Sequence, residues 1–230
     1  MTLQVALKGI DGVVLASDTK WSEVLNGVRQ TFNRSKIVVD HDRRIAVACA
    51  RDMDISAKTA QVIIAEIGDR WSTLHIEEIA ENVRGKMPKT RNANCLIVSP
   101  TLRIFRLETI RDDSGENPRS VCSEHLDRAY AGQDVSAAIF WAERYYCQWQ
   151  SLKLIPLAAF LINAGNKLDP AGIEGLEIVL CDASGIHRLS NDSINVLQSW
   201  ANNTDEVLRT SFGNYDKHFT YDPHESKMVQ

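Results

Sequence analysis

The sequence predicts an α+β fold in which β-sheets pack on one another and helices cover the outside. The predicted elements occur in blocks, in the order strands, two helices, strands, two helices, strands and one helix. This order fits neither repeated βαβ units nor an all-β pattern. Hydrophobic residues make up 44% of the 230 residues, enough to bury the core of one large domain. We therefore expect a single domain over residues 1–230 that ends in a polar tail at 213–230.

Alternating apolar residues and an Asp11-Gly12 turn predict a β-hairpin at the start of the chain. A polar, irregular stretch then runs to Arg34. Residues 111–119 are charged and contain Gly and Pro, which is typical of a surface loop. Further strands, each a short apolar or β-branched run, are expected at 36–39, 45–50, 94–98, 102–107, 129–131, 176–181 and 186–189.

Helices are predicted where apolar residues recur at helical spacing. The clearest case places Ala60, Ile63, Ile64 and Ile67 on one face. The helices are expected at about 55–71, from Thr73 onward, and at about 135–149, 154–166 and 192–211.

Composition and charge exclude several classes of function. The net charge is −4 and no Lys/Arg run exceeds two residues, which argues against a nucleic-acid-binding surface. Charges interrupt every apolar stretch, so no membrane span is expected, and the N-terminus lacks the pattern of a signal peptide. The five cysteines and six histidines show neither a disulfide framework nor metal-ligand spacing. We therefore expect a cytoplasmic protein that needs no metal and no cofactor.

Thr2 is the first residue that points to chemistry. It follows Met1, and a small second residue permits removal of that methionine. Removal leaves a threonine with a hydroxyl and a free α-amine, whose pKa of about 8 leaves part of it neutral at physiological pH. One residue then supplies both nucleophile and base. Many proteins begin Met-Thr without such chemistry, so this pattern alone decides nothing.

Asp18 and Lys36 are expected near Thr2. The strands joined at Asp11-Gly12 bring Asp18 back beside Thr2, where an acid can orient the amine and hold a lysine. Lys36 begins the next predicted strand, and a cation beside the threonine hydroxyl lowers its proton affinity. Taken singly, Asp18 is more readily a turn or cap residue and Lys36 a solvated strand end.

The segment from Thr2 to Asp18 resembles the start of the proteasome β-subunit family and of the related bacterial HslV protease. Arg34-Ser-Lys36-Ile-Val-Val resembles the family's lysine-headed strand, and residues 48–54 resemble its small-residue strand end. The likeness is close over the first fifty residues and covers nearly the whole chain in element order. It implies one β-type domain folded as a four-layer α-β-β-α sandwich of the N-terminal nucleophile hydrolase type.

The resemblance also implies roles for individual residues. Thr2 would be the nucleophile, Lys36 would stabilise it electrostatically, and Asp18 would fix the lysine. The Ala50 N–H would face the developing oxyanion, and Asp169 would support the site from behind.

Two positions depart from the family pattern. Ala50 stands where the family usually has Gly, and an alanine still provides an N–H. Gln133 stands where the family has a catalytic-site serine, and an amide cannot relay a proton as a hydroxyl does. Both departures resemble a divergent bacterial proteasome homologue more than a standard β subunit.

The same resemblance implies a substrate pocket lined by Trp21, Val38, Ala48 and Asp52. The small Ala48 would leave room for a large substrate side chain, and Asp52 would favour a basic one. The function expected is a threonine-type endopeptidase in a self-compartmentalising homo-oligomeric ring, with two stacked rings and peptides or unfolded proteins as substrates. An ATPase that unfolds substrates is left open as a partner.

Two other functions stay open. The first is a catalytically impaired ring-forming structural or binding subunit with the same fold. The second is another N-terminal-nucleophile amidohydrolase that acts on a small amide.

Overall fold

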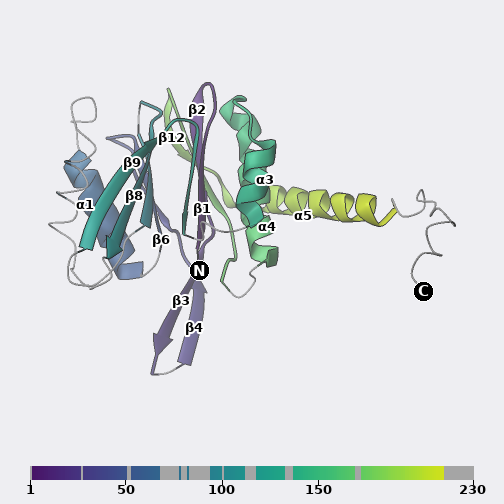
Figure 1. Ribbon diagram of the computed structural model, residues 1–230, viewed down its shortest axis with the longest axis horizontal. Helices are drawn as coiled ribbons and strands as arrows, with labels where there is room; N and C mark the ends of the chain where they lie inside the picture. Colours follow the sequence, from purple (N-terminus) through teal and green to yellow (C-terminus); the bar gives the residue numbers. More distant parts are fainter. Residues whose placement is uncertain are drawn as a thin grey trace, which may run out of the picture.

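The computed structural model describes residues 2–26, 28–50, 53–67, 78, 82, 94–99, 101–111, 118–132, 137–168 and 172–214. Within these residues the chain forms three antiparallel sheets and four helices (Figure 1). Two of the sheets have five strands each and the third has two.

The first sheet contains the N-terminal hairpin. Its spatial order is β10 (Arg128–Gly132), β1 (Leu3–Lys8), β2 (Gly12–Ser17), β11 (Glu177–Asp182) and β12 (Gly185–Arg188). The second sheet runs β5 (Ile37–Asp40), β6 (Ile45–Ala50), β7 (Asn94–Val98), β8 (Ile104–Arg111) and β9 (Pro118–His125). The β1–β2 hairpin lies where the sequence predicts it, with Lys8 paired to Val13.

The two five-stranded sheets face each other, and small or branched side chains fill the space between them. Strands of both sheets contribute to this inner cluster, which contains Ala6, Val13, Leu15, Ile37, Ala46, Ala48, Leu96, Val98, Ile104 and Val179. Side chains alternate along a strand, so the neighbouring residues point to the outer faces. Because helices cover those outer faces as well, the central strands are mostly apolar on both faces instead of alternating apolar and polar.

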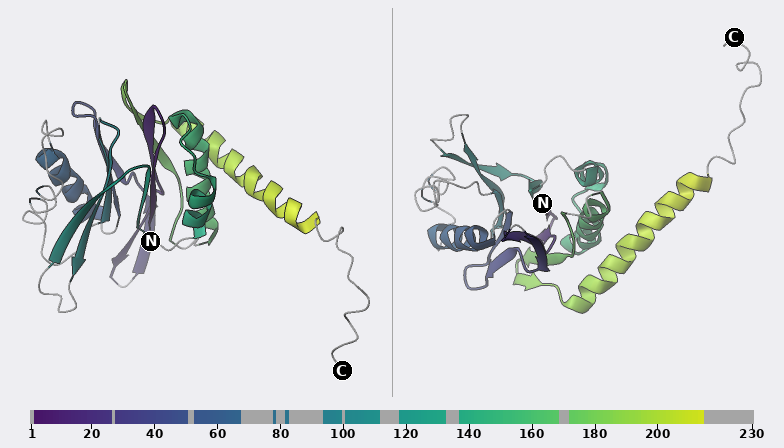
Figure 2. Two further views of the ribbon diagram at one scale, coloured as in Figure 1. Left: turned by 45° about the horizontal axis from the view of Figure 1, so that its top comes forward. Right: turned by 90° about the horizontal axis from the view of Figure 1, so that it is seen from below.

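Helices cover both outer faces (Figure 2). Helix α1 (Met53–Ile67) packs on the second sheet through Ala60, Ile63 and Ile67. Helices α3 (Ala137–Tyr145) and α4 (Ser151–Leu168) pack on the first sheet, where Leu154, Ala158 and Leu161 of α4 are fully buried. Helix α5 (Asn191–Asn214) contacts α4, and its C-terminal end reaches beyond the body of the molecule.

The prediction of a four-layer α-β-β-α sandwich of the N-terminal nucleophile hydrolase type is wrong for this chain, because the described residues form a third sheet that lies outside the two facing sheets and their helices. The third sheet is a hairpin of β3 (Lys20–Leu25) and β4 (Val28–Asn33), which projects away from the body (Figure 1). These residues were expected to be irregular because they are polar. An exposed two-stranded ribbon needs no apolar face along most of its length, so its polar composition is compatible with strand structure.

Other boundaries also differ from expectation. The predicted loop at 111–119 is partly strand, since β9 begins at Pro118 and pairs with β8. The helix predicted to reach 149 ends at Tyr145, and α4 begins at Ser151, whose N–H donates to Asp11 Oδ1 over 2.6 Å. The helix expected from Thr73 lies outside the described residues apart from two isolated positions. No helix in the described ranges is long and apolar enough to cross a membrane.

Candidate active site

Thr2 lies at the start of β1, where strands from both sides approach it. Leu3 pairs with Gly132 of β10, and Gln4 pairs with Ser17 of β2. The Thr2 side chain therefore sits at the end of the central strands, and only 7% of the residue is exposed.

Asp18 is the first residue after β2 and lies against the start of β1. Its Oδ1 accepts the Leu3 N–H at 3.0 Å, and its own N–H donates to the Leu3 carbonyl at 3.2 Å. The carboxylate is fully buried. The β1–β2 pairing places Asp18 here, as the antiparallel hairpin requires.

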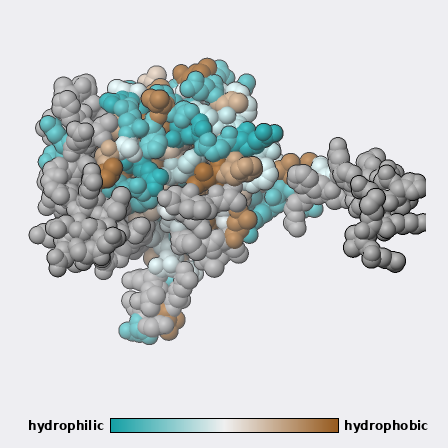
Figure 3. All heavy atoms as spheres, viewed as in Figure 1, coloured by the Kyte–Doolittle hydropathy of each residue, from teal (hydrophilic) through white to brown (hydrophobic). Residues whose placement is uncertain are grey.

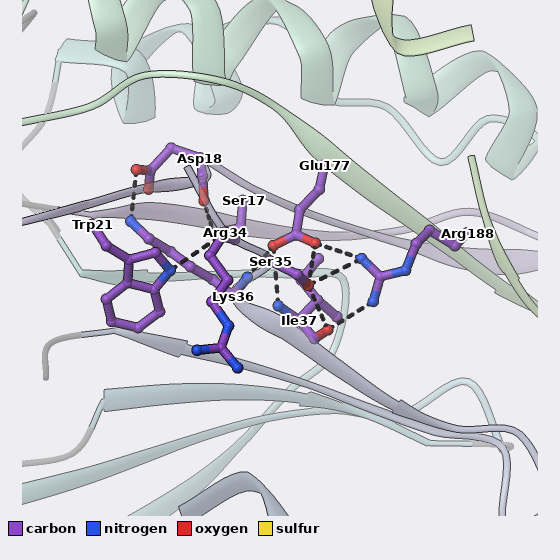
Figure 4. Close-up of polar contacts among 9 residues, drawn as sticks. All are labelled: Ser17, Asp18, Trp21, Arg34, Ser35, Lys36, Ile37, Glu177 and Arg188. Carbon is purple, nitrogen blue, oxygen red and sulfur yellow. Dashed lines mark hydrogen bonds and ion pairs between the residues drawn. The ribbon is translucent and has the colours of Figure 1, made fainter. Parts of the chain in front are cut away.

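Lys36 reaches this position from the second sheet. Its Nζ donates to Asp18 Oδ2 at 2.6 Å and to Thr2 Oγ1 at 2.9 Å, and both charged side chains are fully buried. The ring of Trp21 covers the ammonium group with its centroid 5.1 Å from Nζ, a cation–π contact. Trp21 Nε1 also donates to the Arg34 carbonyl at 3.0 Å, which ties the segment before Lys36 to β3 (Figure 4).

Burial shifts the pKa values of Asp18 and Lys36 in the directions that favour the neutral form of each group. The pKa of Asp18 is raised above 3.8 by desolvation, and the ion pair and hydrogen bonds with Lys36 act against this shift. The pKa of Lys36 is lowered below 10.5 by desolvation, and Asp18 and then Glu177 act against that shift. A lysine with a lowered pKa, in contact with a hydroxyl, is an arrangement typical of sites that activate a nucleophile.

The remaining predicted catalytic residues are less fully placed. Ala50 ends β6, is buried, and pairs with Asn94 of β7. Gln133 and Asp169 lie outside the described residues. Their roles, and that of the Ala50 N–H, stay predictions.

The predicted substrate-binding residues occupy different surroundings. Trp21 packs over Lys36, Ala48 lies in the inner cluster between the sheets, and Val38 packs on the opposite face of the second sheet with the α1 cluster. Asp52 lies outside the described residues. The three described residues therefore do not converge on one surface.

Gly132 is a residue that the sequence analysis did not single out. It has φ +88°, and a Cβ built on it would lie 2.1 Å from the Thr2 carbonyl oxygen. Only glycine fits this conformation and this close approach without strain. A glycine directly before Gln133 was visible in the sequence, but the contact with Thr2 depends on the β1–β10 register.

Gly132→Ala is expected to lower the melting temperature by about 5 °C, because the added Cβ must displace the Thr2 backbone. Thermal unfolding by circular dichroism measures this effect. Gly185→Ala is the matched control, since Gly185 also has positive φ but an added Cβ there meets nothing closer than 3.8 Å. Equal losses in the two variants would show that the Thr2 contact is not what constrains Gly132.

A second group was also missed: Ser35, Glu177 and Arg188 form a polar network beside Lys36 (Figure 4). It joins β11 and β12 of the first sheet to the start of β5 in the second. In the sequence, a carboxylate at the start of an apolar strand is the signal that points to Glu177. The structure shows that this carboxylate is buried. Among the described residues, no cluster of three or more His, Cys, Asp or Glu side chains is arranged to hold a metal.

Comparisons with known proteins show a structural likeness. No protein family model and no curated protein matches the sequence. Anbu from Hyphomicrobium sp. strain MC1 has a TM-score of 0.63 at 14% identity, covering 96% of this chain and 99% of that chain. A Gly-1 mutant of Anbu from the same strain has a TM-score of 0.62 at 14% identity, covering 96% and 100%. Anbu from Yersinia bercovieri, described as an ancestral β-subunit, has a TM-score of 0.62 at 13% identity, covering 92% and 96%.

These findings correct the predicted kinship with the proteasome β-subunit family and HslV. The similar solved structures are Anbu proteins, and identities this low show a shared fold alone. The prediction was wrong because it used the first fifty residues, where the spacing of a threonine, an acid and a lysine does not distinguish one family from another.

Proposed function

We propose that this chain, which shares the fold of Anbu proteins, is an N-terminal threonine peptidase that works in an oligomeric ring. The observation that carries the proposal is the contact of Lys36 Nζ with Thr2 Oγ1 at 2.9 Å, beside the buried Asp18. A buried lysine held by an acid against a threonine hydroxyl, at the residue that removal of Met1 makes N-terminal, matches the requirements for a threonine nucleophile.

The proposed reaction starts from the Met1-free chain. Thr2 Oγ attacks the carbonyl carbon of a peptide bond, its proton passes to the Thr2 α-amine, and the carbonyl electron pair moves onto oxygen. The oxyanion then re-forms the carbonyl, the C–N bond breaks, and the leaving amine takes the proton from the α-ammonium group. Water hydrolyses the resulting ester and restores the Thr2 hydroxyl.

Neighbouring residues have separate roles in this proposal. Lys36 stabilises the negative charge that develops on Thr2 Oγ, and Asp18 holds Lys36 in place. The Ala50 N–H serves as oxyanion donor, a contribution of about 3 kcal/mol per donor in comparable enzymes. Gln133 hydrogen-bonds the α-amine, and Asp169 supports the site from behind.

Exposed hydrophobic side chains support the oligomeric part of the proposal. Helices α3 and α4 and the turn between them expose Phe140, Tyr145, Trp149 and Leu152, and α5 exposes Val196, Trp200 and Val207. Brown patches are visible over the helical side of the body and on α5 in Figure 3. Large exposed apolar groups are typical of interaction surfaces, so we propose contacts between copies of this chain there, in a ring that admits peptides or unfolded proteins.

The test of the proposed function is intact mass spectrometry of the purified protein before and after incubation with a peptide epoxyketone. We expect loss of Met1 and one inhibitor adduct that maps to Thr2. Thr2→Ala is the control and should gain no adduct. If the wild-type chain keeps Met1, or loses it and gains no adduct, the alternative of a ring-forming structural subunit replaces the peptidase.

A further inference from the structure

Lys36 lies at one edge of the second sheet, where its side chain is buried. It directly precedes β5, which is an edge strand and, within the described residues, pairs with β6 alone. An edge strand leaves its outer backbone N–H groups without partners in the sheet. Here the N–H groups of Lys36 and Ile37 both donate to Glu177 Oε1, the second over 3.0 Å. A side chain therefore replaces the missing neighbouring strand.

Glu177 comes from the other sheet. It begins β11 and pairs with Ser17, the residue that precedes Asp18. One carboxylate thus links the main chain that carries Lys36 to the strands that carry Asp18. Figure 4 shows Glu177 between Lys36 and Arg188.

The second carboxylate oxygen is held just as closely. Ser35 Oγ donates to Glu177 Oε2 at 2.7 Å, and Arg188 Nη1 donates to the same oxygen. Arg188 Nη2 also donates to the Ile37 carbonyl at 2.7 Å. Each described partner of Glu177 donates to it, which favours the ionised carboxylate, while burial raises the pKa of this group.

We infer that Glu177 and Arg188 are positioning residues that set Lys36 Nζ against Thr2 Oγ1 by fixing the backbone of residues 35–37. The inference rests on the proposed function, which makes that distance matter for a reaction. A lysine side chain is long and flexible, so where its ammonium group lies depends on where its backbone is anchored. Trp21 covers the ammonium group itself, whereas Glu177 anchors the main chain.

The experiment compares rates of epoxyketone labelling in the full chain. We expect Glu177→Gln to slow labelling about 100-fold, because the amide keeps an acceptor for the two N–H groups but turns a donor toward Ser35 and Arg188. Arg188→Lys keeps the charge but cannot contact Glu177 and the Ile37 carbonyl through two nitrogens at once. It should slow labelling about 10-fold. Glu124→Gln is the matched control: it breaks another Glu–Arg pair, between Glu124 on β9 and Arg103 directly before β8, and should leave the rate unchanged.

The pH profile separates positioning from general loss of structure. Glu177 raises the pKa of Lys36 by Coulomb attraction, so removing its charge lowers that pKa further. If labelling needs charged Lys36, the fall of the labelling rate at alkaline pH (the alkaline limb) reports loss of the lysine proton. This fall should move to lower pH in Glu177→Gln. A lower rate with an unmoved alkaline limb overturns the inference.

A crystal structure of Met1-free Glu177→Gln tests the geometry without using activity. We expect Lys36 Nζ to lie farther from Thr2 Oγ1 than the hydrogen-bond limit of about 3.5 Å. If wild type is not labelled and Lys36 is displaced in the Glu177→Gln structure, the peptidase is rejected and the positioning role is supported. A labelled wild type with Lys36 in place in the variant, and with unchanged labelling, rejects the positioning role and supports the peptidase.

Discussion

Lys36→Met should slow epoxyketone labelling of Thr2 by about 1000-fold or more, the largest effect on reactivity that we expect. Lys36 is the only cation that the described contacts place on Thr2 Oγ1, and its side chain has no solvent exposure. A charge acts strongly there because little water screens it, and losing one preorganised group of this kind typically costs 100- to 1000-fold. Methionine keeps the length and the apolar stem, so the substitution removes mainly the charge.

The measurement is the labelling rate by intact mass spectrometry, with Lys167→Met as the matched control. Lys167 also pairs with an aspartate, Asp205 at 2.6 Å, but on the exposed surface between α4 and α5. The control should label at the wild-type rate, since surface pairs contribute little. Labelling of Lys36→Met within about tenfold of wild type would contradict a role for Lys36 in activating Thr2.

The parts of the site that depend on short-range pairing could be predicted from the sequence. Asp18 lies beside the start of β1 because a tight hairpin at Asp11-Gly12 fixes the register of β1 and β2. The approach of Lys36 to Thr2 was expected from its place at the head of the next strand and from the resemblance, but neither fixes it, since it depends on how the two sheets face each other. Such long-range contacts leave no local pattern.

The errors have physical causes as well. Leu25 pairs with Val28, and Asn26 has φ +52°, so the β3–β4 turn uses the left-handed conformation that Asn-Gly sequences favour. The Asn26-Gly27 pair was present in the sequence, but its polar surroundings indicated a loop. Glu177 was read as part of an apolar strand because its partners, Ser35 and Arg188, are distant in sequence. A carboxylate within an apolar stretch can be recognised in the sequence. The residues that bind it cannot be identified from the same pattern.

Asp18→Asn is expected to give the largest loss of stability, about 3–5 kcal/mol and thus a melting temperature lower by about 10 °C. The substitution leaves the buried Lys36 ammonium without its counter-charge. Thermal unfolding by calorimetry measures the loss. The Asp40–Arg43 pair at the surface gives the control Asp40→Asn: Asp40 is partly exposed, and we expect a change within about 0.5 kcal/mol.

The double variant Asp18→Asn/Lys36→Met should recover most of that stability while labelling of Thr2 stays lost. A neutral, well-packed pair replaces two buried charges, an exchange that is often neutral or stabilising. The pKa shifts of Asp18 and Lys36 also indicate that burying these two charges costs stability. A raised Asp18 pKa means that its contribution to stability is lost as pH rises above about 3.8, and a lowered Lys36 pKa means that its contribution is lost as pH falls below about 10.5. The stability of the double variant relative to wild type should therefore be highest near neutral pH and fall toward both limits. A double variant no more stable than Asp18→Asn would instead show that the ion pair itself stabilises the fold, and that the site is not held at a cost to stability.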